Sequence, residues 1–547
     1  MLAAVWVVSP VLSSPTRLIP IRHNTIQTVP VFNAWTIWWN ANRLTHGFAD
    51  YWDAPIFWPH QSTFAWSEPQ PATIVVAPVL WLTGSPAAAY NAWMLLTLVA
   101  NGLVGFLVVR RQGGHRHVAA IIGILMVWLP INIRQLEVVQ LVAVWPLFWT
   151  WDAARRMFRT GRLVHGIETA AAVAIGFYCS VHHTLFQAVL LLFAGWPLVY
   201  GRLRQLNVLR SLVVSLLISG ALIAIVAVPM HRALNRDEFE RRKDLVTQLS
   251  VRPADLVRPP KDAFVFPTER RATGRSPGWV KLTLGTVGIV LGLLRIRRRR
   301  WTMFLAWTAV CAALLAMGPH LKFDGIVPWW FLWDRVPGLK LVRSVFRFTY
   351  FLQLAVVLLT AVGLHEIYVR VRASGRANVA LGIVWLAGLA ASAELPVPRP
   401  MVAGLPDLKR HTLWTDVVRT NVGPDEGIAC LPFAASPRAR DFGVTVRWMY
   451  YGTQHGKPMV NGYSGFFPDD YLELRREIRE TGLSKKILQR FYDDRIRYLV
   501  IRRDVKVPAQ LLQETSALRL VAAWRDPVVR IDVYRLENSD AAARPSE

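Results

Sequence analysis

The chain has 547 residues, of which 53% are hydrophobic and 18% are charged. Soluble proteins of this length disperse their apolar residues over several domains, whereas here long apolar stretches recur between residues 88 and 396. The net charge of +27 would suit nucleic acid, but the arginines cluster in short loops between these stretches. The composition therefore predicts an integral membrane protein whose partner is the lipid bilayer and excludes nucleic acid as a partner.

The three cysteines, Cys179, Cys311 and Cys430, are far apart in the sequence. They show no metal-ligand spacing and predict neither a disulfide framework nor a zinc site.

Residues 1–13 are apolar but shorter than the roughly 20 residues that a transmembrane helix needs. They are interpreted as part of a first transmembrane helix, with an interfacial segment as the alternative. Residues 14–87 follow as an extracytoplasmic or interfacial first loop that is rich in tryptophan. Within this loop an amphipathic helix over 31–44 is expected at the membrane interface, and a short apolar piece over 73–82 is expected to be re-entrant or interfacial.

Ten further apolar stretches form a multispanning transmembrane domain over residues 88–396, which gives about 10–11 transmembrane helices with the first. The ten predicted spans are 88–109, 118–131, 138–151, 166–181, 184–200, 209–229, 279–294, 301–317, 349–368 and 377–393.

Basic clusters occur in every second loop between these spans, at 110–116, 155–162, 202–204, 295–300 and 370–376. The positive-inside rule assigns these loops to the cytoplasm. By parity, the other face then holds the first loop, the turns at 132–137 and 181–183, the loops 230–278 and 318–348, and everything after residue 396. This predicts a multi-pass membrane protein with its last domain outside the cytoplasm.

Residues 397–540 change to mixed periodicity and predict a small soluble α/β or α+β domain, before a disordered tail at 541–547. Short strands are expected at 428–433, 497–502 and 528–536, and amphipathic helices at 471–481 and 485–493. The fold class is thus a mainly α polytopic membrane protein with a small extracytoplasmic domain.

The acidic residues of the first loop are the candidates for catalysis: Asp50, Asp53 and Glu68. A carboxylate near the membrane plane and among aromatic rings would be desolvated, which favours general-base chemistry. The alternative for each of them is a solvated loop acid.

Arg343 and Arg347 precede the span at 349 with i, i+4 spacing, so on a helix they would share one face. Two guanidiniums on the extracytoplasmic side would suit a phosphate or pyrophosphate, and the alternative is contact with lipid headgroups. His182 and His183 lie on the same side, either as interfacial residues or as hydrogen-bonding partners of a substrate.

Several short motifs together resemble a family. They are DAPIFWP at 53–59, FAWSEP at 64–69, AYN at 89–91, PGLKLVRSVFRF at 337–348 and NGYSGFFP at 461–468. With the aromatic first loop, this pattern resembles bacterial multispanning proteins of the GT-C glycosyltransferase superfamily, in an uncharacterised branch. The resemblance covers nearly the whole chain and is only weakly specific for a substrate.

The resemblance implies inverting transfer of a hexosyl or pentosyl group from a polyprenyl-phosphate sugar to an extracytoplasmic glycan, lipid or protein of the cell envelope. It implies Asp53 or Glu68 as general base and Arg343 with Arg347 at the leaving phosphate. A divalent metal ion occurs in some relatives, and no ligands for one can be named here. The family's usual aspartate aligns with Asn24, in RHNTIQ at 22–27, and an amide cannot act as a base. Two alternatives therefore stay open: an inactive scaffold that binds glycan or partner proteins, and a transporter or flippase of lipid-linked solutes.

Overall fold

A computed structural model describes residues 1–21, 28–258, 274–394, 401–436, 438–505, 518–523 and 529–537. The chain divides into two compact units. Unit 1 comprises residues 1–12, 93–227 and 239–401, and unit 2 comprises residues 13–92, 228–238 and 402–547. The first loop and the C-terminal region therefore belong to one folded unit, although the transmembrane region separates them in the sequence.

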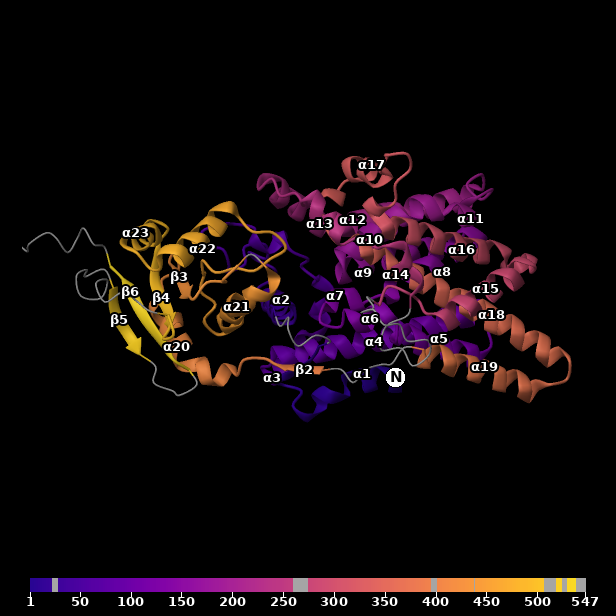
Figure 1. The fold of residues 1–547 in the computed structure, drawn as a ribbon, viewed down its shortest axis with the longest axis horizontal. Helices are drawn as coiled ribbons and strands as arrows, with labels where there is room; N and C mark the ends of the chain where they lie inside the picture. The colour runs from indigo at the N-terminus through magenta and orange to yellow at the C-terminus, as the bar shows by residue number, and fades with distance from the viewer. Residues whose placement is uncertain are drawn as a thin grey trace, which may run out of the picture. The chain divides into compact units, whose positions relative to one another are not determined.

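Unit 1 is a helical bundle (Figure 1). Its elements, two of which (α4 and α12) continue into unit 2, are α1 (Leu2–Val8), η1 (Ser9–Ser13), α4 (Pro86–Arg111), α5 (Arg116–Val127), α6 (Pro130–Arg134), α7 (Val139–Val142), α8 (Trp145–Thr160), α9 (Leu163–Cys179), α10 (Val181–Ala194), α11 (Trp196–Val199), α12 (Leu206–Arg236), α13 (Lys243–Gln248), α14 (Pro253–Val257), α15 (Trp279–Leu293), α16 (Ile296–Met317), η4 (Gly318–His320), α17 (Pro328–Arg335), η5 (Leu339–Leu341), η6 (Val345–Phe348), α18 (Thr349–Ala373) and α19 (Ala377–Ala393).

Every predicted span falls on helical structure. Among the described residues, five helical stretches are long and apolar enough to cross a membrane: Pro86–Arg111, Arg116–Arg134, Leu206–Arg236, Ile296–His320 and Val345–Ala373. Shorter apolar helices, such as Leu163–Cys179 and Ala377–Ala393, accompany them. The protein is a mainly α, multi-pass membrane protein, as the sequence predicts.

Three predicted spans are interrupted in the structure: 118–131 between α5 and α6, 184–200 between α10 and α11, and 138–151 between α7 and α8. In the last of these, α8 continues to Thr160. The buried Asn101 of α4 satisfies the broken backbone: its Nδ2 donates to Val142 O at 2.8 Å, and its Oδ1 accepts from Trp145 N at 2.9 Å. A break in a helix at membrane depth requires such a partner, because no water is there to bond the free groups.

Helices α15 and α18 approach closely because glycines line their contact. Gly285, Gly288 and Gly292 are buried along one side of α15. A Cβ on Gly288 would overlap the carbonyl oxygen of Leu359 and lie 3.0 Å from the backbone nitrogen of Gly363. Small residues let two helix backbones meet in this way, and the resulting contact is held by van der Waals packing.

The basic loops gather at one end of unit 1, as their alternation along the chain predicts. Contacts join residues of the clusters 110–116 and 295–300 to residues close to the other three clusters: Arg111 to Glu168 at 3.4 Å, His115 to Tyr368 at 3.1 Å, Arg295 to Glu366 at 3.2 Å, and Arg300 to the carbonyl oxygen of Tyr200 at 3.0 Å.

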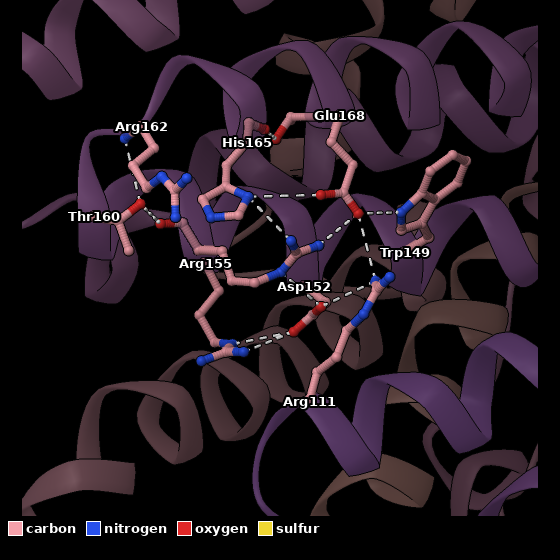
Figure 2. Close-up of polar contacts among 10 residues, drawn as sticks. Arg111, Trp149, Asp152, Arg155, Thr160, Arg162, His165 and Glu168 are labelled. Atoms are coloured by element: carbon pink, nitrogen blue, oxygen red, sulfur yellow. Dashed lines mark hydrogen bonds and ion pairs between the residues drawn. The ribbon is translucent and has the colours of Figure 1, made fainter.

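A buried ion network lies at this end, between α8 and α9 (Figure 2). Asp152, which is fully buried, accepts from Arg155 at 2.8 Å and from Arg156 at 3.0 Å, and Arg111 lies 3.7 Å away. Glu168 accepts from Arg156 at 2.6 Å and from Trp149 at 2.8 Å. The two carboxylates thus bind three guanidiniums that would otherwise repel one another.

The loops of the other parity class meet one another as well. Backbone bonds join Val251 to Ala316 at 2.9 Å, Phe346 to Leu249 at 3.1 Å and Arg241 to Lys340 at 3.1 Å. The loops 230–278 and 318–348 therefore pack together in unit 1.

Unit 2 combines the first loop with the C-terminal domain. Its elements are β1 (Leu18–Ile21), α2 (Thr28–Thr45), η2 (Thr63–Trp66), η3 (Pro71–Val76), α3 (Ala77–Thr83), β2 (Met401–Gly404), α20 (Leu408–Asn421), β3 (Gly427–Leu431), η7 (Ala439–Phe442), α21 (Gly443–His455), α22 (Asp469–Thr481), α23 (Lys485–Asp493), β4 (Ile496–Arg502), β5 (Leu518–Ala523) and β6 (Ile531–Leu536).

A four-stranded sheet in the order β3-β4-β6-β5 forms the C-terminal part of unit 2 (Figure 1). Strand β3 is parallel to β4, with Cys430 opposite Val500, and the other two pairs are antiparallel. Strands β3, β4 and β6 match the three predicted strands, and helices α22 and α23 match the two predicted helices. The sequence prediction missed β5 and helices α20 and α21.

Helix α2 corrects an expectation. The sequence predicts a helix over 31–44 that lies on the membrane interface, but twelve of the eighteen residues of α2 are buried. The rings of Trp35 and Trp39 stack at 6.2 Å between their centroids, and both contact Phe64 edge-on. Helix α2 is thus a core helix of unit 2, and its tryptophans form that core rather than an interfacial belt.

Candidate functional site

Two of the sequence motifs that carry the resemblance lie against each other in unit 2. The ring of Phe57, from the motif at 53–59, contacts Phe467 at 6.0 Å and Tyr471 at 5.0 Å between centroids. A Cβ on Gly462 would lie 2.5 Å from the Phe57 ring, so only glycine fits beneath it. The motif at 461–468 therefore forms the surface on which the first loop packs.

Hydrogen bonds fix the same contact. The backbone nitrogen of Trp58 donates to Met459 O at 2.9 Å, and the Trp58 indole donates to Asp494 O at 2.8 Å. His60 Nε2 lies 3.0 Å from a carboxylate oxygen of Asp470, and this hydrogen bond lowers the pKa of Asp470. The first loop is therefore held by backbone, indole and charged contacts together.

The three candidate acids of this loop lie in different environments. Asp50 and Asp53 are exposed, so the desolvation expected for them from the neighbouring aromatic residues is not found. The rings next to them turn inward: Tyr51 is buried and packs on Phe64. Glu68 is only 5% exposed and is the one of the three that is shielded from water.

Asp53 belongs to a polar cluster at the edge of the loop. Its Oδ1 accepts from the backbone nitrogen of Ser62 at 2.7 Å, and its charge acts on Arg236. Arg236 donates a hydrogen bond to Asp237 at 3.0 Å. Asp237 in turn accepts from the indole of Trp66 at 2.6 Å. The end of α12 thereby closes on the segment that precedes Glu68.

A buried amide network positions the segment that begins at Glu68. Asn40 of α2 donates to the carbonyl oxygens of Pro69 at 2.8 Å and Gln70 at 3.0 Å, and to Thr73 Oγ1 at 2.9 Å. The Tyr51 hydroxyl donates to Asn40 Oδ1 at 2.8 Å. Because one side chain satisfies four groups, it fixes the backbone that carries the Glu68 carboxylate.

Asn40→Ala is therefore expected to destabilise unit 2. Each buried group left without a hydrogen bond costs about 1–3 kcal/mol. In the contacts described, the substitution removes the partner of Pro69 O and of the Tyr51 hydroxyl, whereas Gln70 O and Thr73 Oγ1 still bond each other. Thermal unfolding of the detergent-solubilised protein measures the loss. Asn42→Ala is the matched control, because Asn42 lies half-buried on the same helix and its Oδ1 bonds only its neighbour Arg43 in the contacts described. Equal midpoints for the two variants would contradict the positioning role of Asn40.

Arg343 and Arg347 do not share a helix face. Residues 342–344 lie outside helical structure, between η5 and η6, and only Arg347 lies in η6. Arg343 is exposed and Arg347 is half-buried. The i, i+4 geometry assumed from the sequence is therefore wrong, because the first α-helical residue of this segment is Thr349.

Arg347 instead belongs to a cluster in unit 1 with Tyr350, Glu137 and His183. The charges of Arg347 and Glu137 both act on the hydroxyl of Tyr350. The buried ring of His183 meets that of Tyr350 edge-on at 4.7 Å. The structure thus brings together residues from three loops that the sequence places on the same side of the membrane. Of this cluster, the sequence analysis proposed only Arg347 and His183 as site residues. His182, the neighbour of His183 at the start of α10, is half-exposed.

The remaining expectations concern Asn24 and a metal ion. Asn24 lies outside the described residues. Within the described ranges, no group of three or more His, Cys, Asp or Glu side chains is arranged to hold a metal ion.

Sequence reasoning missed the residues that hold Glu68, namely Asn33, Asn40, Gln70 and Thr73. One signal could have found them: Asn33 and Asn40 are seven positions apart in a helix otherwise rich in apolar and aromatic residues, so they share a face. Gln70 Nε2 donates to Asn33 Oδ1 at 3.1 Å. The partners of this polar stripe lie about thirty residues further along the chain, and no local pattern predicts them.

The comparisons with known proteins concern the fold. No protein-family model matches the sequence, and no curated protein matches it. Among solved structures, it is similar to the oligosaccharyltransferase of Archaeoglobus fulgidus in the apo form, with a TM-score of 0.50 and 12% identity over 91% of this chain and 68% of that one. A second structure is that of the oligosaccharyltransferase AglB from Archaeoglobus fulgidus in complex with an inhibitory peptide and a dolichol-phosphate, with a TM-score of 0.47 and 13% identity over 88% of this chain and 66% of that one.

The chain thus spans about two thirds of the length of these structures. At 12% identity, the likeness to the apo enzyme is a likeness of fold. The helical bundle and the small C-terminal sheet place this protein in the GT-C-like fold of the oligosaccharyltransferases.

Proposed function

We propose that the protein is a membrane glycosyltransferase that transfers a sugar from a polyprenyl-phosphate-linked donor to an acceptor outside the cytoplasm. The observation that carries the proposal is a shielded carboxylate, Glu68, held rigidly in the first loop of a chain with an oligosaccharyltransferase-like fold. A rigid, water-poor carboxylate is what a general base for a hydroxyl acceptor requires.

In the proposed reaction, the oxygen of the acceptor hydroxyl attacks the anomeric carbon of the donor sugar. The bond from this carbon to the phosphate oxygen breaks, and configuration at the carbon inverts. The hydroxyl proton passes to the base, and the electron pair of the broken bond leaves on the lipid phosphate. Glu68 is our first choice for the base because Asp53 and Asp50 are exposed.

Arg343 and Arg347 are proposed to neutralise the charge that develops on the leaving phosphate. A guanidinium binds phosphate oxygens in a bidentate manner and stays charged at every relevant pH. The half-buried Arg347 is the stronger of the two, because a partly desolvated charge interacts more strongly with an anion than an exposed one.

The test uses membranes that contain the full chain and a panel of radiolabelled polyprenyl-phosphate sugars. Label is expected to move to an acid-stable or lipid-free product. Glu68→Gln is expected to lower the rate by about 10²–10⁴-fold, the usual contribution of a general base. Glu480→Gln, an exposed acid of α22, is the control and should leave the rate unchanged.

Three outcomes separate the parts of the proposal. If Asp53→Asn abolishes transfer and Glu68→Gln does not, the base is Asp53 and the function stands. A double variant, Asp53→Asn with Glu68→Gln, that transfers sugar at the wild-type rate would rule out both residues as the base. If membranes carrying the chain transfer no more sugar than membranes without it, the glycosyltransferase proposal is overturned. In that case an inactive scaffold becomes the better description.

A further inference from the structure

Unit 2 contains a cavity of about 790 Å³ that none of the candidate acids lines. Three parts of the unit form its wall: the backbone around β1 and β2, the facing sides of α20 and α21, and the ends of β4 and β6. Its volume falls within the range of roughly 300–1,000 Å³ that small-molecule sites occupy. All of its lining residues belong to the same compact unit.

The cavity wall carries a large excess of positive charge. Its arginines are Arg17, Arg410, Arg447, Arg502, Arg503 and Arg530. Against these six guanidiniums stand two lining carboxylates, Asp407 and Asp504, so six minus two leaves a net charge of +4. Such an excess on a concave wall favours an anionic ligand.

The local ion pairs do not remove this excess. Asp407 lies 3.3 Å from Arg17 and 3.9 Å from Arg410, so one carboxylate is shared by two cations. Asp504 receives a bidentate pair from Arg502 at 2.5 and 2.6 Å. Arg503 pairs with Asp532, which lies outside the lining.

Flat rings form another part of the wall. The imidazole of His411 stacks on Tyr451, with 3.9 Å between the centroids and 22° between the planes. His411 Nδ1 accepts from the indole of Trp414 at 2.9 Å, so in the neutral ring the hydrogen lies on Nε2. Burial raises the pKa of Tyr451 to about 12, which keeps its hydroxyl protonated as a hydrogen-bond donor.

Helix α21 explains why these groups meet. Val444, Arg447, Trp448 and Tyr451 have the spacing i, i+3, i+4, i+7, so one face of α21 brings guanidinium and rings to the same wall. Arg502, the last residue of β4, also lines the cavity. The rings and three of the arginines, Arg410, Arg447 and Arg502, thus lie on helices or strands, whereas Arg17, Arg503 and Arg530 lie directly beside strands β1, β4 and β6.

We infer that this cavity binds a saccharide that bears carboxylate or phosphate groups. The guanidiniums would bind the acidic groups, and the ring faces would contact the apolar faces of the sugar. A concave wall with a ring stack suits a compact glycan better than the flat surface of a bilayer. The binding site stands on the cavity alone, whereas the identification of this saccharide as the acceptor rests on the proposed function.

The test is a binding titration of the full chain in neutral detergent, which needs no catalysis. The carboxylated probe is a galacturonic acid hexamer, and its neutral match is maltohexaose. The hexamer is expected to bind and to raise the thermal unfolding midpoint, with binding that weakens as salt increases. Maltohexaose should bind at least about tenfold more weakly, since it lacks the charge-assisted hydrogen bonds.

Variants locate the site. The Arg410→Gln, Arg447→Gln double variant is expected to bind the hexamer at least about tenfold more weakly. Arg419→Gln is the matched control, because Arg419 is an exposed arginine of α20 that pairs with Asp416 outside the cavity lining. Should the double variant unfold, each single variant replaces it, because Arg410 and Arg447 are both exposed.

Three results would overturn the inference: equal binding of the charged and neutral hexamers, equal loss in Arg419→Gln, and hexamer binding no tighter than that of inorganic phosphate. Binding of phosphatidylglycerol vesicles, without binding of the hexamer, would identify a lipid-headgroup site instead. If the hexamer binds but no sugar is transferred, the binding site stands and the proposed function fails.

Discussion

Asp152→Ala is expected to destabilise the protein by about 3–5 kcal/mol, the usual cost of removing one partner from a buried ion pair. Asp152 is fully buried and accepts from Arg155 and Arg156, with Arg111 nearby (Figure 2). Without it, Arg155 loses the carboxylate that it bonds, and Glu168 alone faces Arg111 and Arg156. The side chains of Arg155 and Arg156 are no more than 14% exposed. Repulsion among the arginines and the cost of burying unpaired guanidiniums then both destabilise the folded state.

The measurement is unfolding of the detergent-solubilised protein with heat or denaturant. Asp416→Ala is the matched control, since Asp416 also pairs with an arginine at i+3, at 2.8 Å, but both side chains are exposed. Exposed pairs contribute about 0–1 kcal/mol, so this variant should unfold close to the wild-type midpoint. An Asp152→Ala variant as stable as Asp416→Ala would show that the Figure 2 network carries no folding energy.

Gly288→Ala is the second large effect that we expect. Its Cβ would overlap the carbonyl oxygen of Leu359, which is backbone and cannot rotate away. Helices α15 and α18 must then separate, and overpacking of this kind costs about 1–3 kcal/mol. The loss should appear as a lower unfolding midpoint, with unchanged helix content by circular dichroism at low temperature.

Gly220→Ala provides the comparison for Gly288→Ala. Gly220 also lies within a long apolar helix, α12, but a Cβ there would meet no atom within 4 Å. Since alanine is the better helix former by about 1 kcal/mol, this variant should be neutral or slightly stabilised. If both variants unfold alike, the close approach of α15 and α18 does not contribute to stability.

Much of the fold follows from local patterns in the sequence. Apolar runs of about 20 residues predict helices in a bilayer, and all ten predicted spans are helical. The break at Ala143 could not be predicted, because the side chain that satisfies it, Asn101, belongs to a different helix. Short amphipathic elements such as α23 were predicted from their period, whereas α20 and α21 were missed.

The candidate site was predictable only in part. The acids of the first loop could be identified from their residue type, but their burial could not. Aromatic residues next to Asp53 suggested desolvation, and the structure buries the rings while it exposes the carboxylate. Asn40 bonds the backbone that follows Glu68, and Gly462 leaves room for the ring of Phe57; periodicity cannot identify either partner.

The shared core of the first loop and the C-terminal domain has a consequence for biosynthesis. Trp58 and its partner Asp494 are 436 positions apart. At about 5–20 residues per second, a ribosome needs roughly 20–90 seconds to connect them. During that interval, the tryptophan-rich first loop has already left the ribosome, but the C-terminal domain on which it packs has not yet been made. The exposed indoles of the loop would invite aggregation, so chaperones or membrane lipids that shelter nascent aromatic segments have their longest opportunity on this part of the chain.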